Sequence, residues 1–184
     1  VVYRAAKRFI NTFKKKSEKD KKLIIAIQTI VGSKPLHLNL FKLATLHSSM
    51  AQTNVHGVKE SNERLEYLGD AVLGAVVAEH LFKKYPLKDE GFLTEMRSRI
   101  VNRESLNTLG KKIGLDKIIE YNQSQSGKLS HKSLYGDTLE ALVGAVYLDR
   151  GFNFSRSFIL EKLIIPYYDL QDLAESTVNF KSSL

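Results

Sequence analysis

The stretch NERLEYLGDAVLGAVVA, residues 62–78, combines an acidic stripe with a long uncharged segment. Its acids Glu63, Glu66 and Asp70 are spaced at i, i+3 and i+7, so an α-helix places all three on one face. Residues 71–78 carry no charge, which predicts that the helix beyond the acids is buried on nearly all sides. The stretch therefore predicts a core helix that begins with a row of carboxylates.

A second stretch, GDTLEALVGAVYLD at residues 136–149, has the same arrangement. Asp137 and Glu140 are spaced at i, i+3, and the eight residues that follow Glu140 are uncharged. Like charges at this spacing destabilise a helix by about 0.2–0.5 kcal/mol per pair. A solvated helix offsets that cost with Lys or Arg three or four residues away, but these two acids, like Glu66 and Asp70, have none.

Four acids that enter a pair of buried helices need a cation, a strong hydrogen-bond network or protonation. Gly74 and Gly144 each lie one turn after an acid, and their missing side chains would let the two helices approach closely. We therefore predict a site of four carboxylates on two crossing helices. All-oxygen ligands favour Mg²⁺, Mn²⁺ or Ca²⁺ over Zn²⁺. The alternative is a set of surface acids that pair with Lys or Arg from elsewhere in the fold.

The rest of the chain is predicted to be helical, because apolar residues recur at helical spacing and no run alternates with a period of two. Helices are predicted over residues 3–13, 23–31, 40–47, 63–84, 91–103, 104–112, 133–150 and 154–163. Residues 48–61 and 122–130 are predicted to be irregular, and the polar tail 169–184 to be a linker. The predicted fold class is all-α, and the length suits one domain with short appendages.

Composition excludes several other classes of protein. The 184 residues are 43% hydrophobic and 26% charged, which is typical of a globular chain. No Cys is present, which excludes a disulfide scaffold, a thiolate nucleophile and a Cys-ligated metal site, and fits a reducing compartment. The longest apolar runs are far too short to span a membrane and no secretory signal is seen, so we expect no membrane association.

The net charge of +8 indicates a polyanionic partner, but the excess is confined to one end of the chain. Residues 1–34 contain ten Lys or Arg and two acids, whereas residues 35–184 contain eighteen of each sign. The basic segment is open to two interpretations: a solvated helical face, or a direct contact with nucleic acid.

Several motifs together resemble the ribonuclease III family. Residues 62–73 resemble the signature of that family, and residues 136–149 resemble its second catalytic motif. Residues 45–49 and 93–98 match weaker family blocks. The similarity covers residues 36–168 in the correct order, and a signature of this length is a specific match.

The resemblance implies a helical ribonuclease III endonuclease domain that cuts double-stranded RNA as a homodimer. The reaction would use Mg²⁺, for which Mn²⁺ can substitute, and no small-molecule cofactor. Metal-activated water would hydrolyse the phosphodiester and leave 5′-phosphate and 3′-hydroxyl ends with a staggered cut. The family also implies a cytoplasmic enzyme that processes ribosomal RNA precursors and messenger RNA.

The resemblance also assigns the metal ligands. They fall on the four acids that the charge pattern singles out, Glu66, Asp70, Asp137 and Glu140. Within the family, the acid at Glu140 holds the metal nearest the chemistry, and the acid at Asp70 is the second indispensable catalytic residue.

Three further positions carry roles by the same resemblance. Glu63 and Glu90 occupy positions that assist near the cleavage site. Tyr67 matches an aromatic residue that packs across the family's dimer interface, and the alternative is an ordinary core residue.

The predicted organisation has three parts. A basic helical segment at 1–34 precedes a catalytic domain at 35–168, and residues 169–184 form a linker. Residues 179–184 resemble the start of the family's double-stranded-RNA-binding domain, so the chain looks like a catalytic fragment. We expect it to bind RNA weakly and to lose that binding as salt rises.

Three alternatives remain at this point. A non-catalytic relative could keep the fold and bind structured RNA as a scaffold, although such a protein is expected to lose metal-binding acids. A helical DNA-binding module would need a basic recognition helix, which residues 35–184 do not offer. A small family member that never carries a binding domain is the third.

Overall fold

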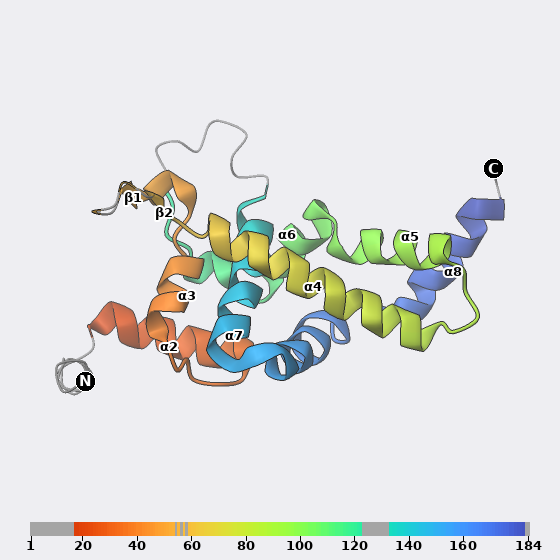
Figure 1. Ribbon diagram of the computed structural model, residues 1–184, viewed down its shortest axis with the longest axis horizontal. Helices are drawn as coiled ribbons and strands as arrows, with labels where there is room; N and C mark the ends of the chain where they lie inside the picture. Colours follow the sequence, from red (N-terminus) through yellow and green to blue (C-terminus); the bar gives the residue numbers. More distant parts are fainter. Residues whose placement is uncertain (1–16, 54, 56, 58, 123–132, 183–184) are drawn as a thin grey trace.

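The computed structural model describes residues 17–53, 55, 57, 59–122 and 133–182. These residues form an elongated helical fold in which α4 and α7 are central, and the all-α prediction is confirmed (Figure 1). The α-helices, labelled as in Figure 1, are α2 (Glu18–Val31), α3 (Leu38–Ala44), α4 (Glu63–Lys84), α5 (Glu90–Val101), α6 (Arg103–Lys112), α7 (Leu134–Phe158) and α8 (Leu170–Ser182). Two 3₁₀ turns span Ser48–Met50 and Leu115–Lys117, and a π-helical segment spans Ile159–Ile164.

One short hairpin lies in the region predicted to be irregular. Strand β1 (Gln52–Thr53) pairs antiparallel with β2 (Lys59–Glu60), with Gln52 opposite Glu60. Each strand has only two residues, so this hairpin is a local feature and the fold class remains all-α. The predicted helix at 3–13 and the loop at 123–130 lie outside the described residues.

The crossing of α4 and α7 forms the centre of the fold and depends on two glycines. A Cβ added to Gly69 would lie 1.7 Å from the carbonyl oxygen of Glu140, and one added to Gly144 would lie 2.3 Å from the carbonyl oxygen of Leu65. The two backbones are therefore in direct contact, as predicted for Gly144. The prediction for Gly74 is wrong, because a Cβ there would meet nothing within 4 Å.

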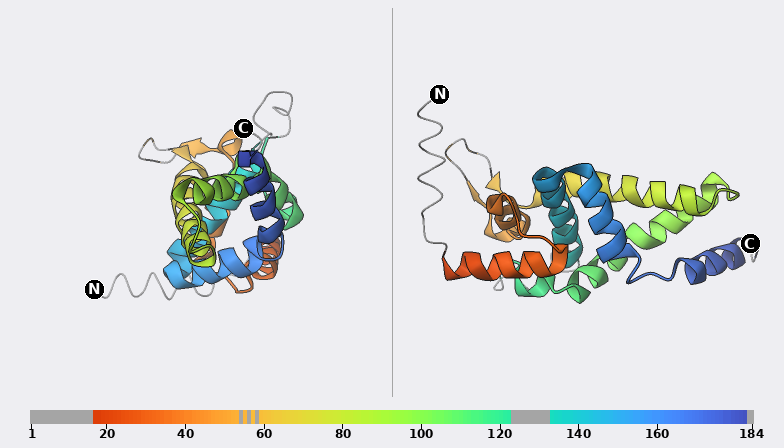
Figure 2. Two further views of the ribbon diagram at one scale, coloured as in Figure 1. Left: turned by 90° about the vertical axis from the view of Figure 1, so that its right-hand side faces the viewer. Right: turned by 90° about the horizontal axis from the view of Figure 1, so that it is seen from below.

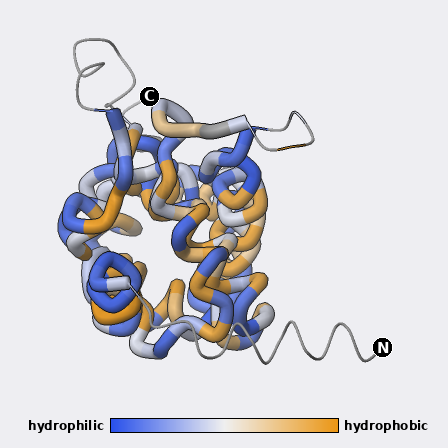
Figure 3. Tube along the Cα trace, turned by 90° about the vertical axis from the view of Figure 1, so that its left-hand side faces the viewer, coloured by the Kyte–Doolittle hydropathy of each residue, from blue (hydrophilic) through white to orange (hydrophobic). Residues whose placement is uncertain are grey.

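The two uncharged stretches differ in burial. Residues 141–146 of α7 are all buried, as predicted, but Leu148 at the end of the uncharged stretch is 51% exposed. The prediction is wrong for α4, where Ala71 and Ala75 are exposed while Val72 and Val76 are buried. The core thus covers only one side of α4, and short apolar stretches alternate with polar ones along the helices (Figure 3).

Helix α2 begins earlier than predicted, inside the Lys-rich stretch. The hydroxyl oxygen of Ser17 accepts a hydrogen bond from the backbone N–H of Asp20 at 3.1 Å, which caps the first turn. The helix ends at Gly32, whose φ of +82° is in the left-handed region that favours glycine. Leu23 and Ile27 pack this helix against the core.

The polar tail is helical, a structure that the linker prediction did not include. Helix α8 packs against α5, where Thr177 is buried against Met96 and the guanidinium of Arg99 donates to the Ser176 hydroxyl at 2.9 Å. Helices α2 and α8 lie at opposite ends of the molecule (Figures 1 and 2). No helix among the described residues is long and apolar enough to cross a membrane.

A buried carboxylate connects the end of α7 to the start of α3. Asp149 accepts hydrogen bonds from the backbone N–H groups of Leu36 at 3.0 Å and His37 at 2.7 Å. Its side chain is 1% exposed, and these amide donors satisfy it. The contact fixes the chain that leads into α3 and then towards the first residues of α4.

Candidate active site

A cavity of about 630 Å³ opens where the first turns of α4 and α7 meet α6. Its walls carry five carboxylates, from Glu63, Glu66, Asp70, Asp137 and Glu140. The Gly69–Gly144 crossing lies directly beside these acids along both helices, so the close backbone contact brings the two rows of carboxylates together. The acids that the charge pattern of the sequence singled out therefore share one cavity.

Three of the acids converge closely enough to share one cation. Glu66, Asp137 and Glu140 each offer a carboxylate oxygen, and these oxygens all lie within 4.8 Å of one another. Asp70 lines the same cavity but does not belong to this group. The hydroxyl of Ser133 donates to Asp137 at 2.7 Å and holds that carboxylate at the start of α7.

The electrostatics of the cavity favour a bound cation. Burial, together with the negative charges of Asp70, Glu66 and Asp137, raises the pKa of the Glu140 carboxyl to about 8 against the opposing effect of Arg103. Burial also raises the pKa of Glu66 to about 6, again with help from nearby acids. The carboxylates resist simultaneous ionisation unless positive charge is supplied. A half-buried set of carboxylate oxygens suits Mg²⁺ or Mn²⁺.

These pKa shifts predict how the stability of the metal-free protein depends on pH. The folded state binds the Glu140 proton more tightly than the unfolded state, whose carboxyl titrates near 4.5, so stability falls as pH rises from about 4.5 through 8. Because the carboxyl is partly exposed, we expect a loss of only about 1 kcal/mol between pH 6 and 9. Urea unfolding in EDTA measures it.

Glu140→Gln should remove most of this pH dependence and make the metal-free protein more stable than the wild type at pH 9. Glu161→Gln, at an exposed position, is the matched control and should keep the wild-type dependence. The same dependence of the unfolding free energy on pH in the wild type and in Glu140→Gln would contradict the expectation.

The remaining predicted site residues are placed differently. Glu63 lines the cavity and accepts a hydrogen bond from the Ser61 hydroxyl at 2.9 Å. Tyr67 also reaches the cavity edge and is 82% exposed, which rules out the alternative of a core residue. Glu90 does not line the cavity: it begins α5, beyond the far end of α4, a helix of about 33 Å.

Sequence reasoning missed the basic residue of the cavity, Arg103. It is the first residue of α6 and the one Lys or Arg among the lining residues. Its position comes from the packing of α6 on α7, which the sequence pattern around residue 103 does not reveal.

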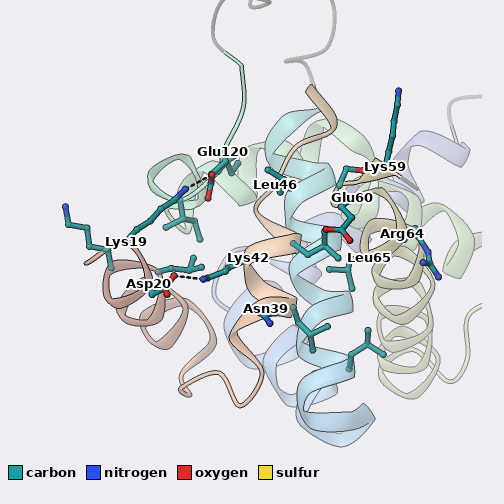
Figure 4. Close-up of a pocket in the computed structure, with 18 of the residues that line it drawn as sticks. Lys19, Asp20, Asn39, Lys42, Leu46, Lys59, Glu60, Arg64, Leu65 and Glu120 are labelled. Atoms are coloured by element: carbon teal, nitrogen blue, oxygen red, sulfur yellow. Dashed lines mark hydrogen bonds and ion pairs between the residues drawn. The ribbon is translucent and has the colours of Figure 1, made fainter. Parts of the chain in front are cut away.

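A larger hollow of about 1110 Å³ lies on another side of α4, between α2, α3 and residues 117–120 (Figure 4). Ion pairs of 2.6 Å join Lys19 to Glu120 and Lys42 to Asp20 beside it. These acids already have basic partners, so the hollow lacks the uncompensated carboxylates of the smaller cavity.

The part of the chain that forms the cavity is also the part that is similar to known proteins. Residues 38–167, which include both acidic helices, match the family model described as Ribonuclease-III-like. This chain belongs to the ribonuclease III family. The family model covers the whole cavity wall formed by α4, α6 and the first turns of α7.

Individual family members match over most of this chain. Ribonuclease 3 of Bacteroides fragilis is 44% identical over 167 residues, which cover 90% of this chain and 57% of that protein. The chain thus spans rather more than half the length of this relative. The nuclease domain of ribonuclease III from Campylobacter jejuni has a TM-score of 0.68 and 31% identity, over 78% of this chain and 95% of that one.

A second structure of the Campylobacter jejuni nuclease domain is described as showing structural flexibility in a region involved in dimer formation. It has a TM-score of 0.67 and 32% identity, and the match covers 76% of this chain and 95% of that one. These relatives show that the chain belongs to the ribonuclease III family and has the fold of its nuclease domains.

Proposed function

We propose that this domain is a divalent-cation-dependent endonuclease that hydrolyses both strands of double-stranded RNA and leaves 5′-phosphate and 3′-hydroxyl ends. The observation that carries the proposal is the convergence of Glu66, Asp137 and Glu140 within 4.8 Å in a cavity open to solvent. All four acids of the metal site implied by the family resemblance line that cavity. The alternative of a non-catalytic scaffold predicts the loss of such acids, and none is lost.

The residues present fit Mg²⁺, because the donor set is made only of carboxylate oxygens. A bound cation would supply Lewis acidity at the phosphate and an activated water. Glu66, Asp137 and Glu140 would hold the cation, with Asp70 on the same wall. The Ser133 hydroxyl keeps Asp137 oriented, and the Ser61 hydroxyl does the same for Glu63 at the cavity mouth.

The test is cleavage of a long RNA duplex by the purified chain in Mg²⁺ at low salt, with EDTA as the control. We expect short duplex products whose 5′ ends are substrates for a 5′-phosphate-dependent exonuclease. Single-stranded RNA and a DNA duplex of the same sequence should survive. Binding of the duplex without cleavage would favour the alternative of a non-catalytic scaffold. Cleavage in EDTA would contradict the proposed dependence on a divalent cation.

The exposed side of α4 supports a homodimer. Tyr67, Ala71, Ala75 and Phe82 are apolar and exposed, and their spacing places them along one side of this helix. An apolar helix face left open to solvent favours association, and the related Campylobacter jejuni domain has a region involved in dimer formation. We propose that two copies of the chain pair through this face, with a cavity in each copy serving one RNA strand.

Ala75→Glu should prevent this pairing, because it places a charge in the middle of the apolar face. We expect the wild type to sediment as a dimer at micromolar concentration and the variant as a monomer with an unchanged helix content. The variant should also lose at least about 10-fold in duplex cleavage, since an association that buries a charge without a partner costs several kcal/mol. Gln28→Glu, on an exposed position of α2, is the control and should remain dimeric. A monomeric wild type would contradict the model.

Ribosomal and messenger RNA precursors as substrates, a cytoplasmic location and the start of an RNA-binding domain at residues 179–184 remain predictions from the resemblance. The basic segment 1–34 has no counterpart in the family's motifs, so the resemblance assigns it no role. The assisting role of Glu90 near the cleavage site is also a prediction. Because Glu90 lies away from the cavity of its own chain, it can assist there only from a second copy of the chain. The dimer would have to bring the start of α5 of one copy towards the cavity of the other.

A further inference from the structure

Arg103 is held at the edge of the acidic cavity by the way α6 crosses the start of α7. A Cβ added to Gly110 would lie 2.4 Å from the carbonyl oxygen of Tyr135, and one added to Gly136 would lie 3.5 Å from the carbonyl oxygen of Arg103. The two backbones therefore touch at both ends of the contact. The first turn of α6 is fixed against the residue that precedes Asp137 in sequence.

Hydrogen bonds strengthen this crossing. The side-chain oxygen of Asn107 accepts from the backbone N–H groups of Tyr135 at 3.0 Å and Gly136 at 3.3 Å. These N–H groups belong to the first turn of α7, which leaves them without partners inside the helix. Asn107 follows Arg103 by one turn of α6, so the backbone of Arg103 has a defined place relative to the carboxylates.

The Arg103 side chain is exposed and lines the cavity beside Glu66, Asp137 and Glu140. Within the described part of the chain it forms no ion pair within 4.0 Å, unlike Arg99, Arg150 and Arg156. Its charge nevertheless acts on the cavity, because it opposes the upward pKa shifts of Glu66 and Glu140. The guanidinium is thus near the acids and still has its donors available.

A polyanionic substrate meets strong repulsion at a cavity walled by five carboxylates, and a fixed cation beside them offsets part of it. A guanidinium suits this task, because its planar donors match two oxygens of a phosphate. We propose that Arg103 binds a backbone phosphate of the RNA beside the carboxylate cluster and positions the phosphodiester for hydrolysis. This role rests on the proposed function, and it adds to the site a substrate contact that the acids alone cannot make.

The competing explanation is that Arg103 only neutralises the acids when no cation is bound. The two roles predict different Mg²⁺ titrations. If Arg103 binds phosphate, Arg103→Gln lowers the single-turnover cleavage rate by about 10–100-fold even at saturating Mg²⁺. If Arg103 is only a counter-charge, the variant reaches the wild-type rate and needs less Mg²⁺, because the freed acids bind the cation more tightly.

The experiment compares single-turnover cleavage of an RNA duplex by the wild type, Arg103→Gln, Arg103→Lys and Lys111→Gln across a Mg²⁺ titration. Arg103→Lys should recover part of the rate, since it keeps the charge but not the planar donors. Lys111→Gln removes the same charge from the last turn of the same helix and should behave as the wild type. A wild-type rate for Arg103→Gln at saturating Mg²⁺ would overturn the proposal.

A binding measurement separates this proposal from the proposed function. In the Glu140→Gln background, where the duplex should stay intact, the logarithm of the RNA affinity is measured against the logarithm of the salt concentration. Loss of one phosphate contact lowers the magnitude of that slope by about one. An unchanged slope for Arg103→Gln would overturn the phosphate contact whether or not the wild type cleaves RNA. A wild type that binds but does not cleave, with a reduced slope for the variant, would overturn the proposed function and keep the contact.

Discussion

Glu140→Gln is expected to lower the rate of duplex RNA cleavage by at least about 1,000-fold, which corresponds to about 4 kcal/mol of transition-state stabilisation. The carboxylate lies within 4.8 Å of those of Glu66 and Asp137 and shares a cavity with Asp70, so it is the common neighbour of both rows of acids. Glutamine has nearly the same shape but removes one negative charge and one ligand oxygen. The loss should therefore fall on cation binding and chemistry, with little effect on the fold.

The measurement is single-turnover cleavage over a range of Mg²⁺ concentrations, together with urea unfolding in EDTA. The variant should be inactive even at high Mg²⁺ and at least as stable as the wild type at pH 8. A neutral amide avoids both the burial of a charge and the repulsion by nearby acids, which together raise the pKa of Glu140 to about 8. Glu161→Gln should change neither quantity. An active Glu140→Gln protein, or one that is inactive because it unfolds, would contradict the assignment of this residue.

The chemistry of the site could be predicted from the sequence because it depends on local spacing. Carboxylates at i, i+3 and i+7 share a helix face whatever surrounds the helix, and the absence of a basic neighbour can be counted directly. This reasoning identified Glu66, Asp70, Asp137 and Glu140, and the structure places all four on one cavity. The tighter convergence of three of them depends on the angle at which α4 and α7 cross, which the sequence does not encode locally.

Features that depend on contacts between distant segments were harder to predict. Arg103 reaches the cavity only because α6 packs on the start of α7, and its neighbours in sequence give no sign of that. Composition suggested that α4 would be buried all round, yet the structure leaves Ala71 and Ala75 exposed. An uncharged composition does not distinguish a helix buried on every side from one with an apolar face open to solvent. Helix α8 was missed because most of its residues are polar, so its sequence resembles that of a linker.

The glycines of α4 also show the difference between local spacing and contacts between distant segments. One of them leads to a prediction of a second large effect, on the stability of the protein. The spacing after Asp70 predicted Gly74 at the close helix crossing, but the glycine of α4 that meets α7 is Gly69, which that prediction did not include. Only the packing of α7 against α4 distinguishes the two glycines. A Cβ at Gly69 would lie 1.7 Å from the carbonyl oxygen and 2.5 Å from the carbonyl carbon of Glu140, whereas one at Gly74 would meet open space.

Gly69→Ala is therefore expected to destabilise the protein by at least about 3 kcal/mol, because a methyl group cannot be accommodated unless α4 and α7 move apart. The atoms in the way belong to the backbone, so no side-chain rotation relieves the clash. Separation of the helices would also move Glu140 away from Glu66, and a misplacement of about 1 Å in an active site can cost 100-fold in rate. We expect loss of cleavage in whatever fraction remains folded.

Gly74→Ala is the matched control on the same helix and should have the opposite sign. Alanine in an open helix interior is favoured over glycine by about 0.5–1 kcal/mol, so the urea midpoint of this variant should rise. Urea unfolding of both variants at one protein concentration, with cleavage rates measured alongside, gives the comparison. Equal midpoints for Gly69→Ala and the wild type would mean that α4 and α7 do not cross in backbone contact, and the convergence of the carboxylates would lose its structural cause. A lower midpoint for Gly69→Ala and a higher one for Gly74→Ala would show that the crossing at Gly69 and Gly144 assembles the site.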